Sequence, residues 1–182
     1  MISRRKFLVT SGAIASAGLI NSMENIQAVV QPKTVNFQGR MKVALIGTGS
    51  RGCNMWGRDL VRNYSEQLEF VGLCDSNPGR LESGKNHIGT SCPTFTDFEQ
   101  MMRETKPDLL IVCTVDNNHH EFIAKGMEMG SNVLTEKPMT IDEQKIQTIL
   151  DAEKKTGKHC RITFNYRYSP HRVKIWELLR AG

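Results

Sequence analysis

The sequence predicts an α/β fold built on a doubly wound parallel sheet, with helices packed on both faces. Short apolar runs alternate along the chain with stretches whose apolar residues recur at helical spacing, as in buried parallel strands joined by crossover helices. A glycine-rich loop directly follows the first apolar run. With 39% hydrophobic and 24% charged residues, the 182-residue chain has an ordinary globular composition and room for one domain or slightly more.

The expected strands are short and mostly apolar, as strands buried on both faces are. The first covers residues 42–47 and includes Val43, Ala44, Leu45 and Ile46. Similar runs lie at 69–75, 109–114, 132–135 and 160–164. We therefore expect one folded domain over residues 41–164.

Capping residues mark where the intervening helices begin and end. Asn77 stands directly before Pro78, which is typical of an N-cap followed by a proline in the first turn. Two capping boxes begin at Thr96 and at Thr140, each with a glutamate three positions later. Gly130 follows another apolar stripe and predicts the end of that helix.

Residues 1–28 have the features of an export signal peptide. A charged start with Arg4 and Arg5 precedes an uncharged stretch, and the small residue Ala28 suits a cleavage site. The paired arginines resemble a twin-arginine signal, and the alternative is a general secretory signal or an uncleaved anchor. The apolar stretch is too short for a spanning helix. We expect a periplasmic or otherwise exported protein without a stable membrane anchor after cleavage, whose residues 29–40 form a linker.

Composition argues against several other classes of protein. Part of the formal net charge of +5 lies in the N-terminal arginines and lysine, so the rest of the chain is too weakly basic for nucleic-acid binding. The five cysteines are widely spaced and form no CxxC pair, which indicates neither a zinc site nor a disulfide framework. His119 and His120 are adjacent and do not share a helix face, so we expect no metal site.

The loop after the first strand has the G-x-G-x-x-G pattern of a dinucleotide-binding turn. Gly47 permits the tight turn, Gly49 lets the backbone approach a pyrophosphate, and Gly52 lets the helix and strand pack closely. Ser50 and Arg51 lie between them, and the backbone N–H groups at the helix start face the phosphates. The alternative is a glycine-rich turn without a ligand.

Asp75 ends the second expected strand, where an acid accepts hydrogen bonds from the adenosine ribose. A carboxylate at this place repels a 2′-phosphate, and no arginine immediately follows it. The sequence therefore favours NAD over NADP as cofactor. A purely structural role, in which Asp75 ends the strand and caps the next helix, is compatible with this one.

Two further motifs make the pattern more specific. Thr114, Asp116 and His119 follow the fourth expected strand, and Glu136-Lys137-Pro138 follows the fifth. Together with the glycine loop and the acid, they resemble the Gfo/Idh/MocA oxidoreductase family from about residue 42 to residue 182. The resemblance implies a Rossmann-like NAD-binding domain, with residues 165–182 as the start of a truncated substrate domain whose catalytic histidine lies beyond residue 182.

The resemblance also implies roles for individual residues. Lys137 would be catalytic, hydrogen-bonding the substrate hydroxyl and assisting proton transfer beside the nicotinamide; the alternative is a surface lysine paired with Glu136. Pro138 would follow a cis peptide bond. Val115 departs from the proline usual in the family. The remaining cofactor-binding positions lie in the loops after three strands: Thr114, Asn117, His119, Glu136, Asn165 and Arg167, with Tyr168 either in this group or in an ordinary linker.

These observations support one leading function and two alternatives. The chain is expected to be the NAD-binding part of an exported oxidoreductase that acts on a sugar or polyol by hydride transfer at a carbinol carbon. The first alternative is an NAD-dependent glycosidase on the same fold, without net redox change. The second is a non-catalytic nucleotide-binding module. We expect the full-length protein to be a homo-oligomer, and the sequence does not identify the sugar.

Overall fold

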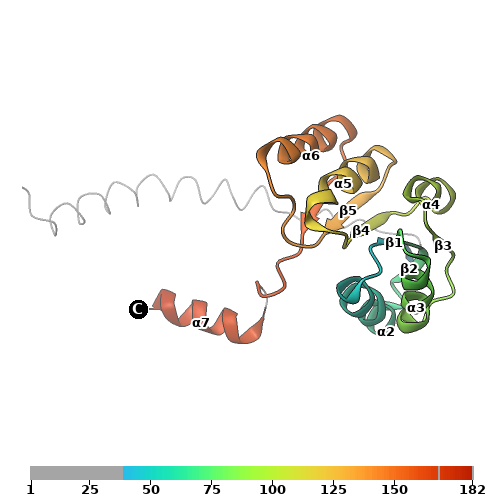
Figure 1. Cartoon of the computed structure of the whole chain (residues 1–182). Coiled ribbons are helices and arrows are strands. Elements are labelled where there is room, and N and C mark those ends of the chain that lie inside the picture. The colour runs from blue at the N-terminus through green and yellow to red at the C-terminus, as the bar shows by residue number, and fades with distance from the viewer. Residues whose placement is uncertain (1–38, 168, 182) are drawn as a thin grey trace, which may run out of the picture. The chain divides into compact units, whose positions relative to one another are not determined.

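The structure is a computed structural model that describes residues 39–167 and 169–181 (Figure 1). The predicted export signal, nearly all of the predicted linker and Tyr168 lie outside the described residues. A six-stranded parallel sheet forms the centre of the fold, with the order β3-β2-β1-β4-β5-β6. Its strands are β1 (Met41–Ile46), β2 (Leu68–Cys74), β3 (Thr94–Phe95), β4 (Leu109–Val112), β5 (Asn132–Thr135) and β6 (Cys160–Ile162).

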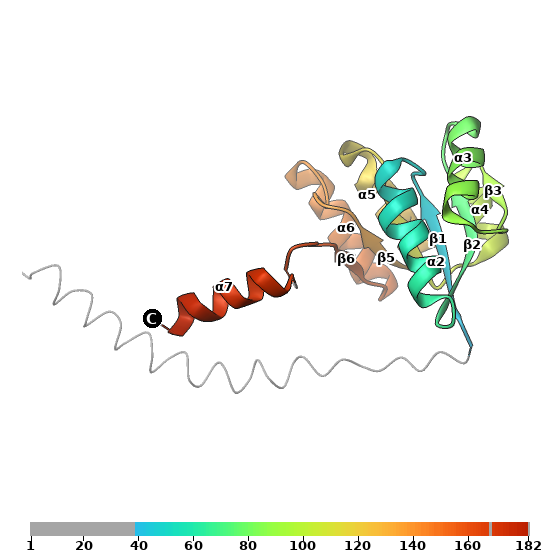
Figure 2. The same cartoon turned by 90° about the horizontal axis from the view of Figure 1, so that it is seen from below.

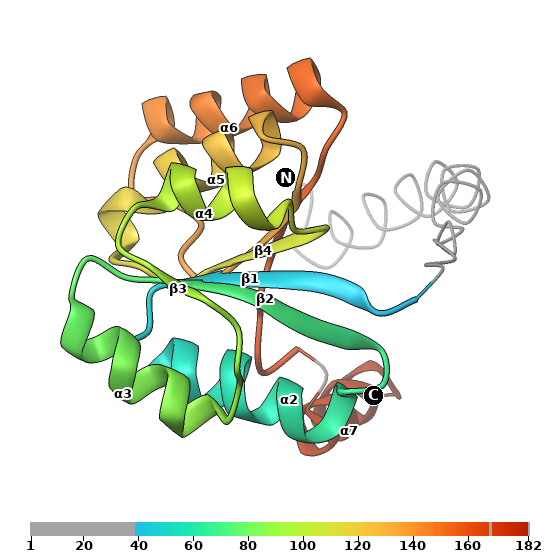
Figure 3. The same cartoon turned by 90° about the vertical axis from the view of Figure 1, so that its right-hand side faces the viewer.

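The helices cover both faces of this sheet (Figures 2 and 3). Alternate residues of β1 separate two cores, since Val43 and Leu45 join one cluster while Ala44 and Ile46 join the other. One face carries the π-helix η1 (Gly52–Arg58), α2 (Asp59–Tyr64) and α3 (Pro78–Ile88). The other carries α4 (Phe98–Thr105), α5 (His119–Glu128) and α6 (Glu143–Thr156). The predicted doubly wound α/β fold is therefore confirmed.

The strand order reverses between β1 and β4, because β2 and β3 lie on one side of β1 while β4, β5 and β6 lie on the other. In such sheets the loops at the carboxyl ends of the strands separate at the reversal and leave a crevice. The loop after β1 and the short 3-10 helix η2 (Asp116–Asn118) after β4 border this crevice.

Two helices begin at different caps from those that the sequence predicts. Asp97 caps α4 by accepting a hydrogen bond of 2.6 Å from the backbone N–H of Gln100, and Asp142 caps α6 in the same way. The threonines that open the two capping boxes therefore lie outside the helices. An aspartate offers a charged acceptor that the positive end of the helix dipole favours. The cap at Asn77 is confirmed.

Two short features escape the sequence analysis. β3 has only two residues, too few to show a pattern of apolar residues. The helix after the glycine loop begins as a π-helix, in which Gly57 lies so close to Ile88 that a Cβ atom would come within 2.4 Å of Ile88 Cγ1. The absence of a side chain at Gly57 therefore lets η1 pack closely against α3.

The last helix, α7 (Pro170–Ala181), has no buried residue. Its apolar side chains are exposed, with Leu179 at 79%. The assignment of residues 165–182 to a second domain stays a prediction. Across the described residues, no helix is both long and apolar enough to span a membrane.

Candidate functional site

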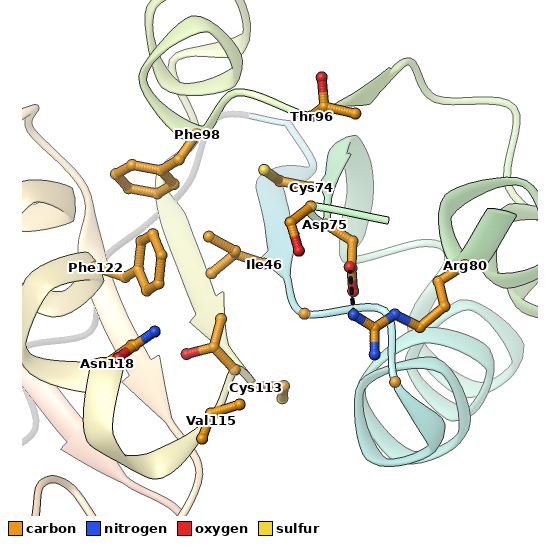
Figure 4. Close-up of a pocket in the computed structure, with 14 residues that line it drawn as sticks. Ile46, Cys74, Asp75, Arg80, Thr96, Phe98, Cys113, Val115, Asn118 and Phe122 are labelled. Atoms are coloured by element: carbon orange, nitrogen blue, oxygen red, sulfur yellow. Dashed lines mark hydrogen bonds and ion pairs between the residues drawn. The ribbon is translucent and has the colours of Figure 1, made fainter. Parts of the chain in front are cut away.

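A cavity of about 390 Å³ lies over the carboxyl ends of β1, β2 and β4 (Figure 4). One side is apolar, formed by Ile46 and by Phe98 and Phe122, whose rings meet edge to face with centroids 5.1 Å apart. Asp75 and Arg80 form the polar side. The cavity combines a slot for a flat apolar group with a charged end.

The three glycines of the loop occupy positions that fit the roles predicted for them. Gly47 has a φ of +94°, and a Cβ there would lie 2.4 Å from the Cys113 carbonyl oxygen. A Cβ at Gly52 would lie 2.1 Å from the Gly47 carbonyl oxygen, so strand and helix are in close contact. Nothing lies within 4 Å of a Cβ built at Gly49, which lines the cavity. The loop can therefore receive a phosphate against bare backbone at Gly49.

Asp75 lies at the end of β2 with its carboxylate nearly buried. It accepts hydrogen bonds from the backbone N–H and hydroxyl of Thr48, from the backbone N–H of Asn77 and from the Arg80 guanidinium. Burial by itself would raise the pKa of Asp75. The hydrogen bonds from Asn77 and Thr48 and the charge of Arg80 outweigh it and hold the pKa below its ordinary value. Asp75 is therefore an anion at neutral pH.

Glu136, at the end of β5, is held by two residues of η1 and the loop before it. Its Oε1 atom accepts a hydrogen bond of 2.8 Å from Arg51 Nε and one of 2.7 Å from Trp56 Nε1. Burial would raise the pKa of Glu136, but the bonds from Arg51 and Trp56 bring it below its ordinary value. Arg51 and Glu136, both predicted to contact the cofactor, thus contact each other.

A second cavity, of about 540 Å³, contains Lys137. Its lining also includes Asp116, Glu136 and Asn165. Lys137 is exposed, and its ammonium makes no hydrogen bond or ion pair with any described residue. The peptide bond between Lys137 and Pro138 is cis, as the family resemblance implies. The carboxylate of Glu136 is therefore engaged by hydrogen bonds from Arg51 and Trp56, whereas the side-chain nitrogen of Lys137 is available to a ligand.

The two cavities share Cys113 and Thr114. Burial, with a smaller contribution from the charge of Glu136, raises the pKa of the Cys113 thiol to about 12, so this group is neutral. The Thr114 hydroxyl is buried and has no partner among the described residues. An unsatisfied buried hydroxyl is costly, and Thr114 is one of the residues that line both cavities.

His119 is almost completely buried at the start of α5. Its Nδ1 lies 2.8 Å from the Pro138 carbonyl oxygen, and its Nε2 lies 3.1 Å from that of Thr114. The ring thereby connects the loop after β4 to the segment after β5. Its predicted contact with a cofactor stays a prediction, and the geometry gives it a positioning role for the Thr114 and Pro138 backbone.

The remaining predicted residues lie at different distances from the cavities. Asn117 is exposed and hydrogen-bonds Lys145, whereas the next residue, Asn118, lines the first cavity. Asn165 lines the second cavity. Arg167 is exposed, and its backbone N–H donates to the Phe164 carbonyl.

Sequence reasoning missed Arg80, Trp56 and Asn118. Arg80 stands five residues after Asp75 in the first turn of α3, and this spacing after a strand-ending acid is a signal that could have found it. Trp56 carries no such signal, because it meets Glu136 across 80 residues of sequence. Among the described residues, no group of three or more His, Cys, Asp or Glu side chains could hold a metal ion.

Comparison with known proteins assigns residues 41–164 to the family described as "Oxidoreductase family, NAD-binding Rossmann fold". YteT of Bacillus subtilis is 35% identical over 77% of this chain and 34% of its own length. Glycosyl hydrolase family 109 protein 1 of Akkermansia muciniphila is 27% identical over 99% of this chain and 45% of its own. An inositol 2-dehydrogenase/D-chiro-inositol 3-dehydrogenase of Lactiplantibacillus plantarum is 25% identical over 78% of this chain and 40% of its own length.

Among solved structures, the WlbA dehydrogenase of Bordetella pertussis, in complex with NADH and UDP-GlcNAcA, superposes with a TM-score of 0.71. It is 20% identical, over 79% of this chain and 42% of its own, so the likeness concerns the fold. The chain spans less than half the length of these relatives.

Proposed function

The chain belongs to the Gfo/Idh/MocA oxidoreductase family, and its residues 41–164 form an NAD-binding Rossmann fold. We propose that it is the NAD-binding part of a dehydrogenase that acts on a sugar or polyol. The reaction is the interconversion of an alcohol and a carbonyl at a carbinol carbon. Relatives of the chain include an inositol 2-dehydrogenase/D-chiro-inositol 3-dehydrogenase and a D-glucoside 3-dehydrogenase.

The observation that carries this proposal is the pair of cavities that share Cys113 and Thr114 in their linings. A dinucleotide has two halves connected by a pyrophosphate. The apolar slot with Asp75 suits the adenosine half, the loop at Gly49 suits the pyrophosphate, and the cavity with Lys137 suits the nicotinamide and the substrate. Thr114, whose buried hydroxyl has no partner among the described residues, lines both cavities.

Bound NAD would supply the hydride acceptor. Lys137 supports the other half of the reaction, since its side chain is available to hydrogen-bond the substrate hydroxyl and, in its deprotonated form, to take up the hydroxyl proton as the carbonyl forms. In the reverse direction the same group returns the proton. Arg51 and Trp56 hold the neighbouring Glu136 carboxylate, so that it does not form an ion pair with this amine.

The test is a turnover assay on the complete protein with a panel of sugars and polyols. Sugar-dependent reduction of NAD supports the dehydrogenase. Nucleotide binding without any turnover would favour a non-catalytic nucleotide-binding module instead.

A glycosidase is the second candidate, because two glycosyl hydrolase family 109 proteins are among the relatives and one aligns with 99% of this chain. In that reaction the sugar is oxidised and later reduced again by the same cofactor, and a glycosidic bond is broken. Release of the leaving group from an aryl glycoside, with no net change in NADH absorbance, would favour this candidate over the dehydrogenase.

We propose further that the protein is exported in folded form with its cofactor bound, on the basis of Arg4 and Arg5 in the N-terminal sequence. An exported enzyme meets little free NAD, so the nucleotide must stay bound and be regenerated in place. The mature protein is purified without added nucleotide and denatured, and the supernatant is assayed. Near-stoichiometric NAD is expected, whereas empty protein active only with millimolar added NAD would contradict both export and retention.

A further inference from the structure

Glu136 precedes Lys137 in the chain, and both side chains line the second cavity. An ion pair between them would favour the charged form of Lys137 and occupy its donors. Both effects would weaken a group that has to accept a proton from a substrate. The cavity is also lined by other titratable or charged side chains: Arg51, Cys113, Asp116, His119 and Tyr166.

Two donors hold the Glu136 carboxylate, and they differ in how a bound nucleotide would affect them. Arg51 Nε and Trp56 Nε1 lie 2.8 Å and 2.7 Å from the same Oε1 atom. The Arg51 side chain is 45% exposed and belongs to the glycine loop, where its guanidinium also attracts a phosphate. The indole N–H of Trp56 is a neutral donor, which a phosphate attracts less strongly. Trp56 is therefore the donor that keeps hold of Glu136 when a dinucleotide engages Arg51.

Trp56 is also firmly anchored in the fold. Its ring is half-buried and packs against the core cluster that contains Leu45. The next residue, Gly57, is buried so close to α3 that a Cβ atom there would lie 2.4 Å from Ile88 Cγ1. Packing against the core and against α3 thus fixes the position of the indole N–H, whether or not a ligand is bound.

We infer that Trp56 is a positioning residue for the proposed reaction: its indole N–H holds the Glu136 carboxylate beside η1, so that Glu136 does not pair with Lys137. The Lys137 side chain thereby stays available to the substrate hydroxyl. The inference rests on the proposed function and deepens it, but the hold on Glu136 can be measured without any substrate. Loss of the indole N–H should release Glu136 to Lys137 and make Lys137 harder to deprotonate.

The experiment measures, at several pH values, how fast Lys137 of the complete protein reacts with acetic anhydride, by mass spectrometry of the peptide that contains it. Only the uncharged amine reacts, so a slower reaction means that the charged form is favoured. Trp56→Phe keeps an aromatic ring and removes the N–H. We expect it to slow the labelling of Lys137 near neutral pH about threefold, as for a partly exposed ion pair. Lys106, an exposed lysine at the end of α4, is the internal standard.

Trp176→Phe is the matched control, because Trp176 is the chain's other tryptophan and lies exposed in α7. It should leave the labelling of Lys137 unchanged. Trp56→Phe combined with Glu136→Gln removes the carboxylate as well, and its rate should equal that of Glu136→Gln alone. A general loosening of the fold would slow or speed Lys137 in both backgrounds. Circular dichroism verifies each fold, and Trp56→Tyr replaces Trp56→Phe if the latter does not fold.

The kinetic counterpart uses NAD with myo-inositol or methyl β-D-glucoside as the probe. The pH at which kcat/KM rises should move upward by about 0.5 in Trp56→Phe, which corresponds to the same threefold change, and should not move in Trp176→Phe.

The outcomes separate this inference from the function on which it rests. A change in Lys137 labelling below about 1.5-fold in Trp56→Phe, half of the expected effect or less, overturns the role of Trp56. A change of the same size with and without Glu136 overturns it too, because Trp56 then does not act through that carboxylate. If labelling slows as expected but no sugar or polyol is oxidised, the hold on Glu136 is supported and the proposed dehydrogenase is wrong.

Discussion

The two cavities that share Cys113 and Thr114 differ in how the charged side chains of their linings are paired. In the first, the carboxylate of Asp75 and the guanidinium of Arg80 compensate each other at the edge of an apolar slot. In the second, Arg51 and Trp56 hold Glu136, while Lys137 next to it has no partner among the described residues. Both acids end strands of the same sheet, and each is paired with an arginine from another element.

This difference suggests that the first cavity is the binding end of the site and that the second cavity, with Lys137, is the reacting end. At the first end the Arg80 side chain is 55% exposed and lines the first cavity together with Asp75, so a ligand can reach the pair. At the second end the pair is reinforced by an indole N–H, and what it leaves available is the neighbouring amine. Variants of residues at each end can test whether the two ends work independently.

Lys137→Ala in the complete protein should have the largest effect. We expect turnover to fall by about 10²–10⁴-fold, the usual contribution of general acid–base assistance, with little change in NAD affinity. Steady-state kinetics and nucleotide titration measure the two quantities separately. A loss of turnover below tenfold would remove Lys137 from catalysis, and an equal loss of NAD affinity would show that the two ends are coupled.

Gly49→Val should abolish nucleotide binding and leave the fold intact, since the added side chain enters open space that a pyrophosphate needs. We expect an affinity loss of about 100-fold or more, because displacing the pyrophosphate forfeits several backbone hydrogen bonds. Gly52→Val is the contrasting variant, because its Cβ would lie 2.1 Å from the Gly47 carbonyl oxygen and should disrupt the fold itself. Native circular dichroism with unchanged affinity in Gly49→Val would mean that the loop is not the site.

Glu136→Gln should lower stability in a pH-dependent way. The pKa of Glu136 in the folded protein lies below its ordinary value of 4.5. The stability that its charge contributes is therefore fully present above that ordinary value and is lost as the pH falls through the lowered one. We expect a loss of about 1 kcal/mol at pH 7, in the range of a hydrogen bond to a charged group, and a smaller loss near pH 3.

Urea unfolding at both pH values measures this difference. A penalty for Glu136→Gln that is equal at pH 7 and pH 3 would show that the charge of Glu136 does not matter to the fold. Glu99→Gln is a control, since that glutamate is exposed and pairs with Lys125 and Arg103 at the surface. Its effect should be smaller at pH 7.

Asp75→Asn should have the smallest effect, because Arg80 already offsets part of the charge of Asp75. We expect the preference for NAD over NADP to narrow by about threefold, as for a partly screened charge, measured as the ratio of the two dissociation constants. A preference that widens would contradict the assignment of Asp75 to the ribose position.

The sequence by itself determined five of the six strands and the glycine loop after β1. Buried parallel strands are continuous apolar runs. The bounds of β1, β2 and β5 could therefore be predicted to within a residue or two from the local sequence alone. The loop glycines could be assigned as well, because the absence of a side chain is a property of each residue alone. Gly47, Gly49 and Gly52 have the backbone space that their pattern predicts.

Only the tertiary structure decided which polar groups meet. Arg51 is 85 residues from Glu136, and nothing local to either residue indicates their contact, which requires the loop after β1 and the end of β5 to face the same crevice. The ring of His119 is likewise directed by Pro138, 19 residues away. Apolar periodicity determines which face of an element is buried. It carries no information on which side chain of another element forms a hydrogen bond with a given polar group. Pairings of charged groups at the crevice therefore depend on strand order and loop conformation, which arise only when the sheet is assembled.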